Sequence, residues 1–263
     1  MRRKTGLKKS RLRRGIYLLP NIFTSLNIFC GFYAIIAAIN GKFIAAAVSI
    51  IIAGLFDNID GKIARATNTT SKFGVEYDSL ADLISFGLAP GLMMYLWALK
   101  PLGRIGWLAA FLFMVCGALR LARFNTQAGT ISGDHFVGLP IPAAAGMNTV
   151  TVLIYHKFGL DGQASPVLIL IMLYALSFLM VSSIKYNSFK KPELLRKMNF
   201  NVLVASILIL IFIAAQPSIA LFLFGTAYVI SGPFTTIRHH KKVKQEQTET
   251  REIDEPRSSP IKP

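Results

Sequence analysis

The chain has 263 residues, of which 53% are hydrophobic and 16% are charged, and its formal net charge is +16. The charged fraction lies below the roughly 25% that is usual in soluble domains, which argues against an ordinary soluble protein. Because the chain is so hydrophobic, its basic balance favours a membrane surface over nucleic acid as the partner. The two cysteines, Cys30 and Cys116, both lie in apolar runs, which argues against a disulfide framework.

A basic arm occupies residues 1–15, ahead of the first apolar run. Further long apolar runs follow, and no clear small-residue cleavage site separates the first run from them. We therefore interpret the first run as a retained membrane anchor and not as a signal peptide. At the other end, residues 241–263 combine charge with Pro and Ser and almost no large apolar side chains, which predicts a disordered cytoplasmic tail.

Residues 16–240 contain eight apolar segments that are candidates for crossing a membrane. The candidates in chain order are Tyr17–Ile39, Phe43–Thr67, Phe73–Leu96, Ile105–Phe124, Pro140–Tyr155, Val167–Ile184, Val202–Ala215 and Ile219–Ile237. This pattern predicts an all-α fold, a polytopic integral membrane helical bundle with about eight transmembrane helices.

The distribution of positive charge predicts the orientation of these segments. With the N-terminus inside and the segments alternating, the inside parts hold 25 Lys and Arg residues. The outside connections hold only Lys42, Lys100, Arg104 and Lys157. Cytoplasmic loops of membrane proteins carry such an excess of Lys and Arg. We therefore expect a multi-pass protein of the inner (cytoplasmic) membrane with both termini on the cytoplasmic side.

The stretch from position 57 to position 82 reads DNIDGKIARATNTTSKFGVEYDSLAD and holds most of the acids of the apolar body. Acidic side chains at membrane depth are costly unless they are paired or bound to metal, so this stretch is a predicted functional site. Its first half places two aspartates, two small residues and an arginine on one helical face: Asp57, Asp60, Gly61, Ala64 and Arg65. Its second half places a glycine and two aspartates on one face of a second helix: Gly74, Asp78 and Asp82.

The connector between the two helices, ATNTTSKF, is short, which predicts that the helices are antiparallel neighbours. The four aspartates then converge, and without a partner they would repel one another strongly in a low dielectric. Divalent cations with oxygen ligands remove that conflict, so we expect a metal site. The two glycines leave room for a ligand to approach the backbone.

The spacing D-x2-D-G-x2-A-R-x8-G-x3-D-x3-D resembles the signature of the CDP-alcohol phosphotransferases at every fixed position. The runs DSLADLISFGLAP, RLARFN and VGLPIPAAAG look like the phosphatidylserine synthase branch of that family. The resemblance implies transfer of the phosphatidyl group from CDP-diacylglycerol to the hydroxyl of L-serine, with release of CMP. It also implies a divalent cation, Mg²⁺ or Mn²⁺, as cofactor and a homodimer as the assembly.

The resemblance also implies roles for individual residues. The metal ligands would be Asp57, Asp60, Asp78 and Asp82, with Asp78 and Asp82 as the catalytic pair. Asp82 would either share a second metal or accept the serine proton as general base. Residues implied to bind the CDP-lipid are Asn21, Thr24, Gly61, Ala64, Arg65 and Gly74. For Asn21 and Thr24, interhelical hydrogen bonding is an equally good interpretation.

Three basic residues are candidates for binding serine: Arg120, Arg123 and Lys185. The two arginines end the fourth predicted span, where they either anchor the helix at the cytoplasmic face or bind a carboxylate or a phosphate.

Three rival functions fit parts of the pattern. The first is another transferase of the same group, which uses a glycerol phosphate or inositol acceptor. The second is an ion-coupled transporter, although that predicts acids spread over several spans. The third is a structural membrane protein whose helix pair is held together by metal.

Overall fold

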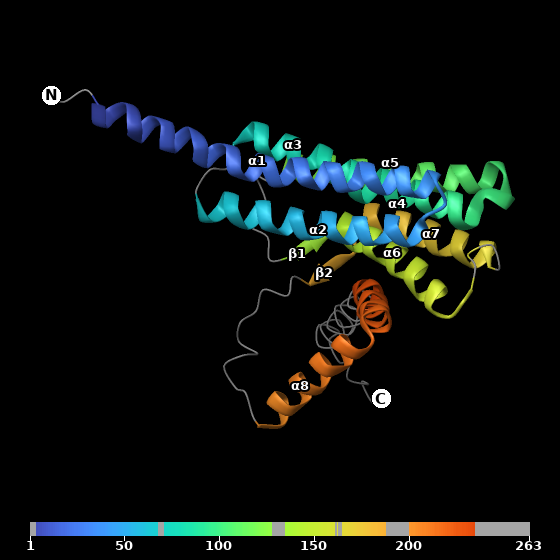
Figure 1. Cartoon of the computed structure of the whole chain (residues 1–263). Coiled ribbons are helices and arrows are strands. Elements are labelled where there is room, and N and C mark those ends of the chain that lie inside the picture. The colour runs from blue at the N-terminus through green and yellow to red at the C-terminus, as the bar shows by residue number, and fades with distance from the viewer. Residues whose placement is uncertain are drawn as a thin grey trace, which may run out of the picture.

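The computed structural model describes residues 4–67, 71–127, 135–160, 162, 165–187 and 200–234 of the chain. Within these residues the protein is a bundle of helices with one short pair of strands (Figure 1). The predicted all-α membrane fold is confirmed. The predicted disordered tail, residues 241–263, lies outside the described residues.

Long helices form the described part of the bundle, and a short turn joins the first two of them. They are α1 (Lys4–Ile39), α2 (Phe43–Ala66), α5 (Arg104–Gln127), α6 (Ile141–Lys157) and α7 (Pro166–Val181). Between α2 and α5 runs one continuous helical stretch in which α-helical turns alternate with π-helical turns and which ends in a 3-10 turn. Its parts are α3 (Lys72–Asp82), η1 (Leu83–Leu88), α4 (Ala89–Met94), η2 (Tyr95–Leu99) and η3 (Lys100–Leu102).

A helix occurs at each of the eight predicted positions. Five described stretches are long and apolar enough to cross a membrane: Leu19–Ile39, Phe43–Ala66, Lys72–Leu102, Arg104–Gln127 and Pro217–Phe234. Helix α7 and the segment Ser206–Ala215 are shorter apolar helices. The protein is therefore a multi-pass membrane protein, and the count of eight spans stays a prediction.

The sixth predicted segment, Val167–Ile184, extends three residues past the end of its helix. Helix α7 ends at Val181, and strand β2 (Lys185–Asn187) pairs antiparallel with β1 (His135–Val137). The Ile184 carbonyl accepts a hydrogen bond of 2.8 Å from the amide of Gly138, the residue after β1. Ile184 is therefore bonded to the neighbouring strand segment and does not continue helix α7. The apolar run alone gave no sign of this change.

The interior of the bundle is lined by small side chains. Helix α1 packs along α2, α2 along α6, and α5 along α7. The buried alanines on the first pair are Ala34, Ala37 and Ala38 of α1 and Ala46, Ala47 and Ala53 of α2. Small residues let helix backbones approach closely in a membrane. Large apolar side chains such as Phe29, Phe32 and Leu55 instead remain exposed on the outer faces, where a lipid bilayer would cover them.

The closest approach between α1 and η1 is at Gly31. An ideal Cβ at this position would lie 2.8 Å from the Cα of Ser85, a distance that real Cβ atoms do not show. The Ser85 hydroxyl donates a hydrogen bond of 2.9 Å to the Asn27 carbonyl one turn earlier on α1. The helix that carries Asp78 and Asp82 is thus held against α1 just beyond the acidic stretch.

We expect Gly31→Ala to destabilise the protein by about 1–3 kcal/mol, because overpacking forces two backbones apart. The measurement is thermal unfolding of the purified protein in detergent. Gly146→Ala in α6 is the matched control, since nothing lies within 4 Å of a Cβ there. An unchanged melting temperature for Gly31→Ala would contradict the close approach.

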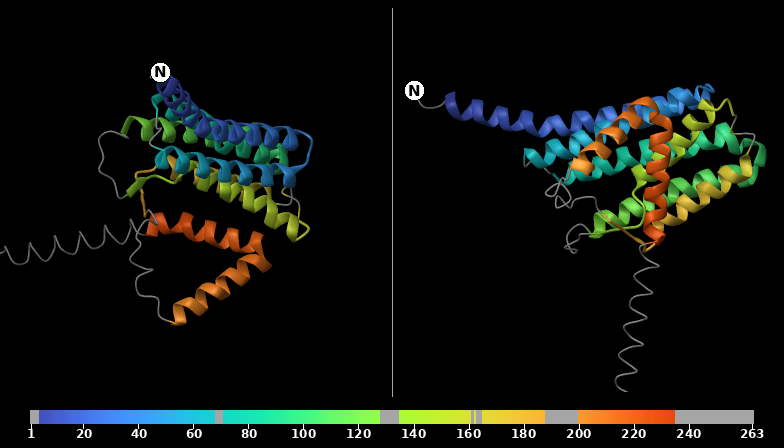
Figure 2. Two further views of the ribbon diagram at one scale, coloured as in Figure 1. Left: turned by 60° about the vertical axis from the view of Figure 1, so that its left-hand side comes forward. Right: turned by 90° about the horizontal axis from the view of Figure 1, so that it is seen from below.

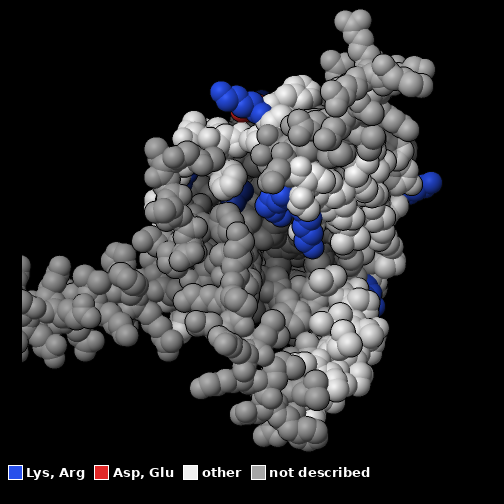
Figure 3. All heavy atoms as spheres, turned by 90° about the vertical axis from the view of Figure 1, so that its left-hand side faces the viewer, with Lys and Arg blue, Asp and Glu red and all other residues white. Residues whose placement is uncertain are grey.

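The two ends of the bundle differ in the residues they carry. One end of the bundle, which we call the site end, holds the end of α2, the start of α3, the end of α5 and the β1–β2 pair, and α1 begins on that side (Figure 1). The four basic residues of the predicted outside connections, Lys42, Lys100, Arg104 and Lys157, lie at the opposite end. Several described Lys and Arg side chains are visible on the face of the molecule that Figure 3 shows.

A hairpin of two helices lies beside the bundle. It consists of α8 (Phe200–Ala215) and the helix Pro217–Phe234 (Figure 2). The second helix contacts α6, where the Thr226 hydroxyl lies 3.9 Å from the Met147 sulfur. Phe222 and Tyr228 of this helix pack against the core, so it forms part of the wall of the bundle.

Candidate metal and nucleotide site

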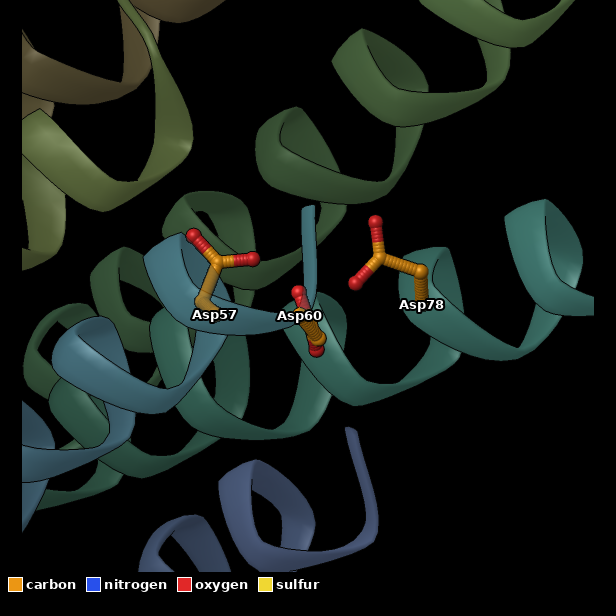
Figure 4. A group of neighbouring side chains, drawn as sticks. All are labelled: Asp57, Asp60 and Asp78. Carbon is orange, nitrogen blue, oxygen red and sulfur yellow. The ribbon is translucent and has the colours of Figure 1, made fainter. Parts of the chain in front are cut away.

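Three aspartates from two helices meet at the site end. Asp57 and Asp60 project from α2, and Asp78 projects from α3 toward them (Figure 4). One carboxylate oxygen from each lies within 4.8 Å of the others. Oxygens at this spacing are able to share one cation, whereas three unpaired carboxylates would repel one another.

Helix α3 packs mainly on α1 and not along α2. The predicted neighbourhood of the α2 and α3 helices therefore holds only around the aspartates. Ser71 caps the start of α3, where its hydroxyl accepts a hydrogen bond from the Gly74 amide at 3.0 Å. The result is a gap between α2 and α3 whose floor is α1.

That gap is a cavity of about 190 Å³. Its lining includes every residue that the family resemblance assigns to the CDP-lipid: Asn21, Thr24, Gly61, Ala64, Arg65 and Gly74. Asp60 and Asp78 also line it. The structure therefore brings these predicted residues together around one space, next to the aspartates, and their individual roles stay predictions.

Small residues keep the cavity open. The Arg65 guanidinium lies over Gly61, with its terminal nitrogens 3.6 Å from an ideal Cβ at that position. At Gly74 an ideal Cβ would lie 3.7 Å from the Asn21 side-chain oxygen. A larger side chain at Gly61 would fill the space beside the Arg65 guanidinium, a group that suits a phosphate, and one at Gly74 would fill the space beside Asn21.

Thr24 ties α1 to the acidic cluster. Its hydroxyl donates to Asp60 Oδ2 at 2.9 Å and also lies 3.1 Å from the Pro20 carbonyl oxygen. Both Thr24 and Asp60 are buried. Thr24 therefore makes an interhelical hydrogen bond, one of its two interpretations from the sequence. It also lines the cavity, so this bond is compatible with the other interpretation, contact with the CDP-lipid.

Asp82 and Arg120 adjoin the aspartate cluster but do not line the cavity. The Asp82 carboxyl reaches that of Asp57, and the Arg120 guanidinium on α5 is an electrostatic neighbour of Asp82. Neither residue lines the cavity that Asp60 and Asp78 line. The cluster thus borders the cavity through Asp60 and Asp78, and it neighbours α5 through Asp82.

Several buried polar atoms here have no hydrogen-bond partner among the described residues. They are Asp78 Oδ1, Asp82 Oδ1 and Arg120 Nε. Buried polar atoms in folded proteins nearly always have partners, and an unsatisfied one points to a bound ion or ligand. Oxygen donors of this kind suit Mg²⁺ and Mn²⁺, so the residues fit a divalent cation.

The other two candidates for serine binding are not brought into the cluster. Arg123, one turn beyond Arg120 on α5, has no described contact with the aspartates. Lys185 is the first residue of β2, and its side chain is not described. Of the three basic candidates, Arg120 is the one that the structure places beside an aspartate of the motif.

Sequence reasoning missed three residues near the site. Ser71 lines the cavity, and a Ser three residues before Gly74 was a visible capping signal. Ser79 accepts a hydrogen bond of 3.0 Å from the Asn125 side chain, which ties the end of α5 to α3. Tyr228, on the helix Pro217–Phe234, is an electrostatic neighbour of Arg120, and nothing in its apolar surroundings in the sequence indicated this.

Comparison with known proteins gives a consistent result. A family described as CDP-alcohol phosphatidyltransferase matches residues 17–181. The CDP-diacylglycerol--serine O-phosphatidyltransferase of Helicobacter pylori is 41% identical over 218 residues, which cover 82% of this chain and 90% of the relative. The archaetidylserine synthase of Methanothermobacter thermautotrophicus is 40% identical over 170 residues, 64% of this chain and 69% of that protein. A Bacillus subtilis CDP-diacylglycerol--serine O-phosphatidyltransferase is 38% identical over 174 residues, 66% of this chain and 92% of that protein.

Proposed function

The chain belongs to the CDP-alcohol phosphatidyltransferase family, and we propose that it transfers the phosphatidyl group of CDP-diacylglycerol to the hydroxyl of L-serine, releasing CMP. The observation that carries this proposal is the convergence of Asp57, Asp60 and Asp78 beside a cavity lined by the remaining motif residues. Serine is the acceptor because the names of the bacterial and the archaeal relatives share it.

The geometry suits a lipid donor and a water-soluble acceptor. The cavity lies at the site end of membrane-spanning helices, where the pyrophosphate of a CDP-lipid sits at headgroup level and its acyl chains stay in the bilayer. Arg65 and the small residues around it hold the nucleotide part of the donor. We place this end at the cytoplasmic face of the inner membrane, since described basic residues predicted to lie inside, among them Arg65, Lys72 and Arg123, belong to the ends of α2, α3 and α5 found there.

The reaction we propose is a single displacement at phosphorus. The serine oxygen forms a bond to the phosphorus that carries the diacylglycerol, and the bond from that phosphorus to the CMP oxygen breaks. Asp82 accepts the serine hydroxyl proton, because it adjoins Asp57 of the cluster and does not line the nucleotide cavity. CMP leaves with its phosphate, and phosphatidylserine remains in the membrane.

Asp57, Asp60 and Asp78 are the residues that would hold a divalent cation, Mg²⁺ or Mn²⁺. Such a cation supplies charge neutralisation for the pyrophosphate and for the departing CMP. We also propose a homodimer as the assembly, which rests on the family resemblance alone.

Arg120 is our candidate for binding the serine carboxylate. It lies beside Asp82, and its buried Nε has no described partner, so a carboxylate held there would complete its hydrogen bonds. Its planar guanidinium suits two parallel hydrogen bonds to a carboxylate, which Lys does not provide. Serine would then lie with its hydroxyl toward Asp82.

We expect Arg120→Lys to raise the KM for serine by about 10-fold to 100-fold, the cost of a hydrogen bond to a charged group. The KM for CDP-diacylglycerol should stay nearly unchanged. Steady-state kinetics with each substrate varied in turn measure both constants. Arg123→Lys, one turn away on the same helix, is the matched control and should change neither. An equal rise in both constants for Arg120→Lys would assign the residue to the fold and not to serine.

The direct test of the function is formation of CMP from CDP-diacylglycerol by the purified protein, with and without L-serine and a divalent cation. We expect CMP release that depends on both, together with labelled phosphatidylserine when the serine is labelled. Release that depends instead on glycerol phosphate or inositol would make the protein another member of the same family. No release with any acceptor would leave a structural or transport role.

A further inference from the structure

A second cavity, of about 980 Å³, opens at the end of the bundle opposite the aspartates. Its walls are the turn between α1 and α2, the η2 segment and the last turn of α6. Trp97 is buried against this cavity, edge-on to Tyr155 at 5.3 Å between ring centroids, and the Gly162 backbone packs on its ring. These contacts fix the indole, so the cavity has a rigid aromatic wall.

The polar groups of this cavity are cationic or neutral. Lys42 and His156 line it, together with the hydroxyl groups of Tyr33 and Ser49. The neighbouring Lys157 is already engaged, because its ammonium donates to the Gln216 side chain. The charged residues that line the described part of this cavity are thus basic, and Asp161, which follows Leu160 in the sequence, lies outside the described residues. Lys42 and His156 suit an anionic ligand.

Part of the lining is apolar and faces outward. Ile44 and Val48 line the cavity and are exposed on the outer face of α2. In a bilayer that face would be covered by lipid. Tyr side chains are enriched where membrane-spanning helices meet the headgroups, and Tyr33, which lines the cavity, is exposed on α1. The cavity thus joins a cationic rim to a surface that acyl chains cover.

We propose that this cavity binds one anionic phospholipid. Its phosphate lies against Lys42 and His156, and its acyl chains run along Ile44 and Val48. Ile44 and Asp60 are 16 residues apart on α2, which is about 24 Å at the rise of an α-helix. The lipid site is therefore separate from the substrate site, and the proposal does not depend on the reaction that the aspartates perform.

The test is binding of dioleoyl-phosphatidylglycerol to the full-length protein in neutral detergent, followed by native mass spectrometry and thermal unfolding. Other cationic regions of the chain also attract anionic lipid, so variants identify the site. Lys42→Gln removes a charge from the rim, and Val48→Trp fills the cavity without a change of charge. Lys100→Gln removes an exposed charge at the same end but outside the cavity, and serves as the control.

We expect Lys42→Gln to weaken phosphatidylglycerol binding about fivefold, the effect of one basic side chain near a lipid phosphate. Val48→Trp should remove one bound lipid, and Lys100→Gln should change nothing. All three variants should retain CMP release, which shows that they fold. Equal binding by all variants, or equal binding of dioleoyl-phosphatidylcholine by the unaltered protein, would overturn the proposal. It would also be overturned if Val48→Trp changed the oligomeric mass and left lipid binding intact, since a second copy of the chain would then occupy the cavity.

Discussion

Asp78→Asn is expected to reduce CMP formation by more than about 100-fold. Mutation of a residue that only hydrogen-bonds to a metal ligand lowers activity by about 10–100-fold, and loss of a ligand itself should lower it further. Asp78 is the carboxylate of α3 that meets Asp57 and Asp60, and it also lines the nucleotide cavity. Its loss removes the contribution of α3 to the shared cation. The measurement is CMP release at saturating CDP-diacylglycerol and serine, titrated with Mg²⁺ and Mn²⁺.

Glu76→Gln is the matched control for this experiment. Glu76 lies two residues earlier on α3, carries the same charge and is exposed, outside the cluster. Its replacement should leave turnover and metal dependence unchanged. Near-normal turnover of Asp78→Asn in either metal would remove Asp78 from the catalytic machinery, provided that the variant inserts into the membrane and unfolds at the normal temperature.

Asp82→Asn is expected to lower turnover by about 100-fold to 10,000-fold, the range for loss of a general base. Binding of CDP-diacylglycerol should remain close to normal, because Asp82 does not line the nucleotide cavity. The defect should persist across the pH range, since an amide accepts no proton at any pH. Calorimetric binding of the CDP-lipid, together with a pH profile of CMP release, measures both effects.

Asp57→Asn provides the contrast for Asp82→Asn, because the two carboxyls contact each other. As a metal ligand, Asp57 should be needed for metal-dependent binding of the CDP-lipid as well as for turnover. If Asp82→Asn loses that binding to the same degree as Asp57→Asn, then Asp82 holds a second cation and another group accepts the serine proton.

Much of this protein is determined by its sequence alone, for reasons of bilayer chemistry. Long apolar runs in a chain with few charges form helices in a bilayer. Lipid tails cannot hydrogen-bond to backbone N–H and C=O groups, and a helix satisfies these groups within the segment itself. The positions of the helices were therefore predictable. The grouping of the motif residues was predictable too, since spacings of three and four place Asp57 and Asp60, and Asp78 and Asp82, on single helical faces.

The tertiary structure alone decided how those faces are arranged. Helix α3 packs on α1 because Gly31 allows η1 to approach it closely, and this packing leaves open the cavity between α2 and α3. The rotation of α5 is set by its packing on α7 and by the Asn125–Ser79 hydrogen bond, so Arg120 meets Asp82. Such contacts depend on side-chain shapes at helix crossings that are distant in the chain. No local periodicity records them, which is why Tyr228 reaches Arg120 without any signal in the sequence around it.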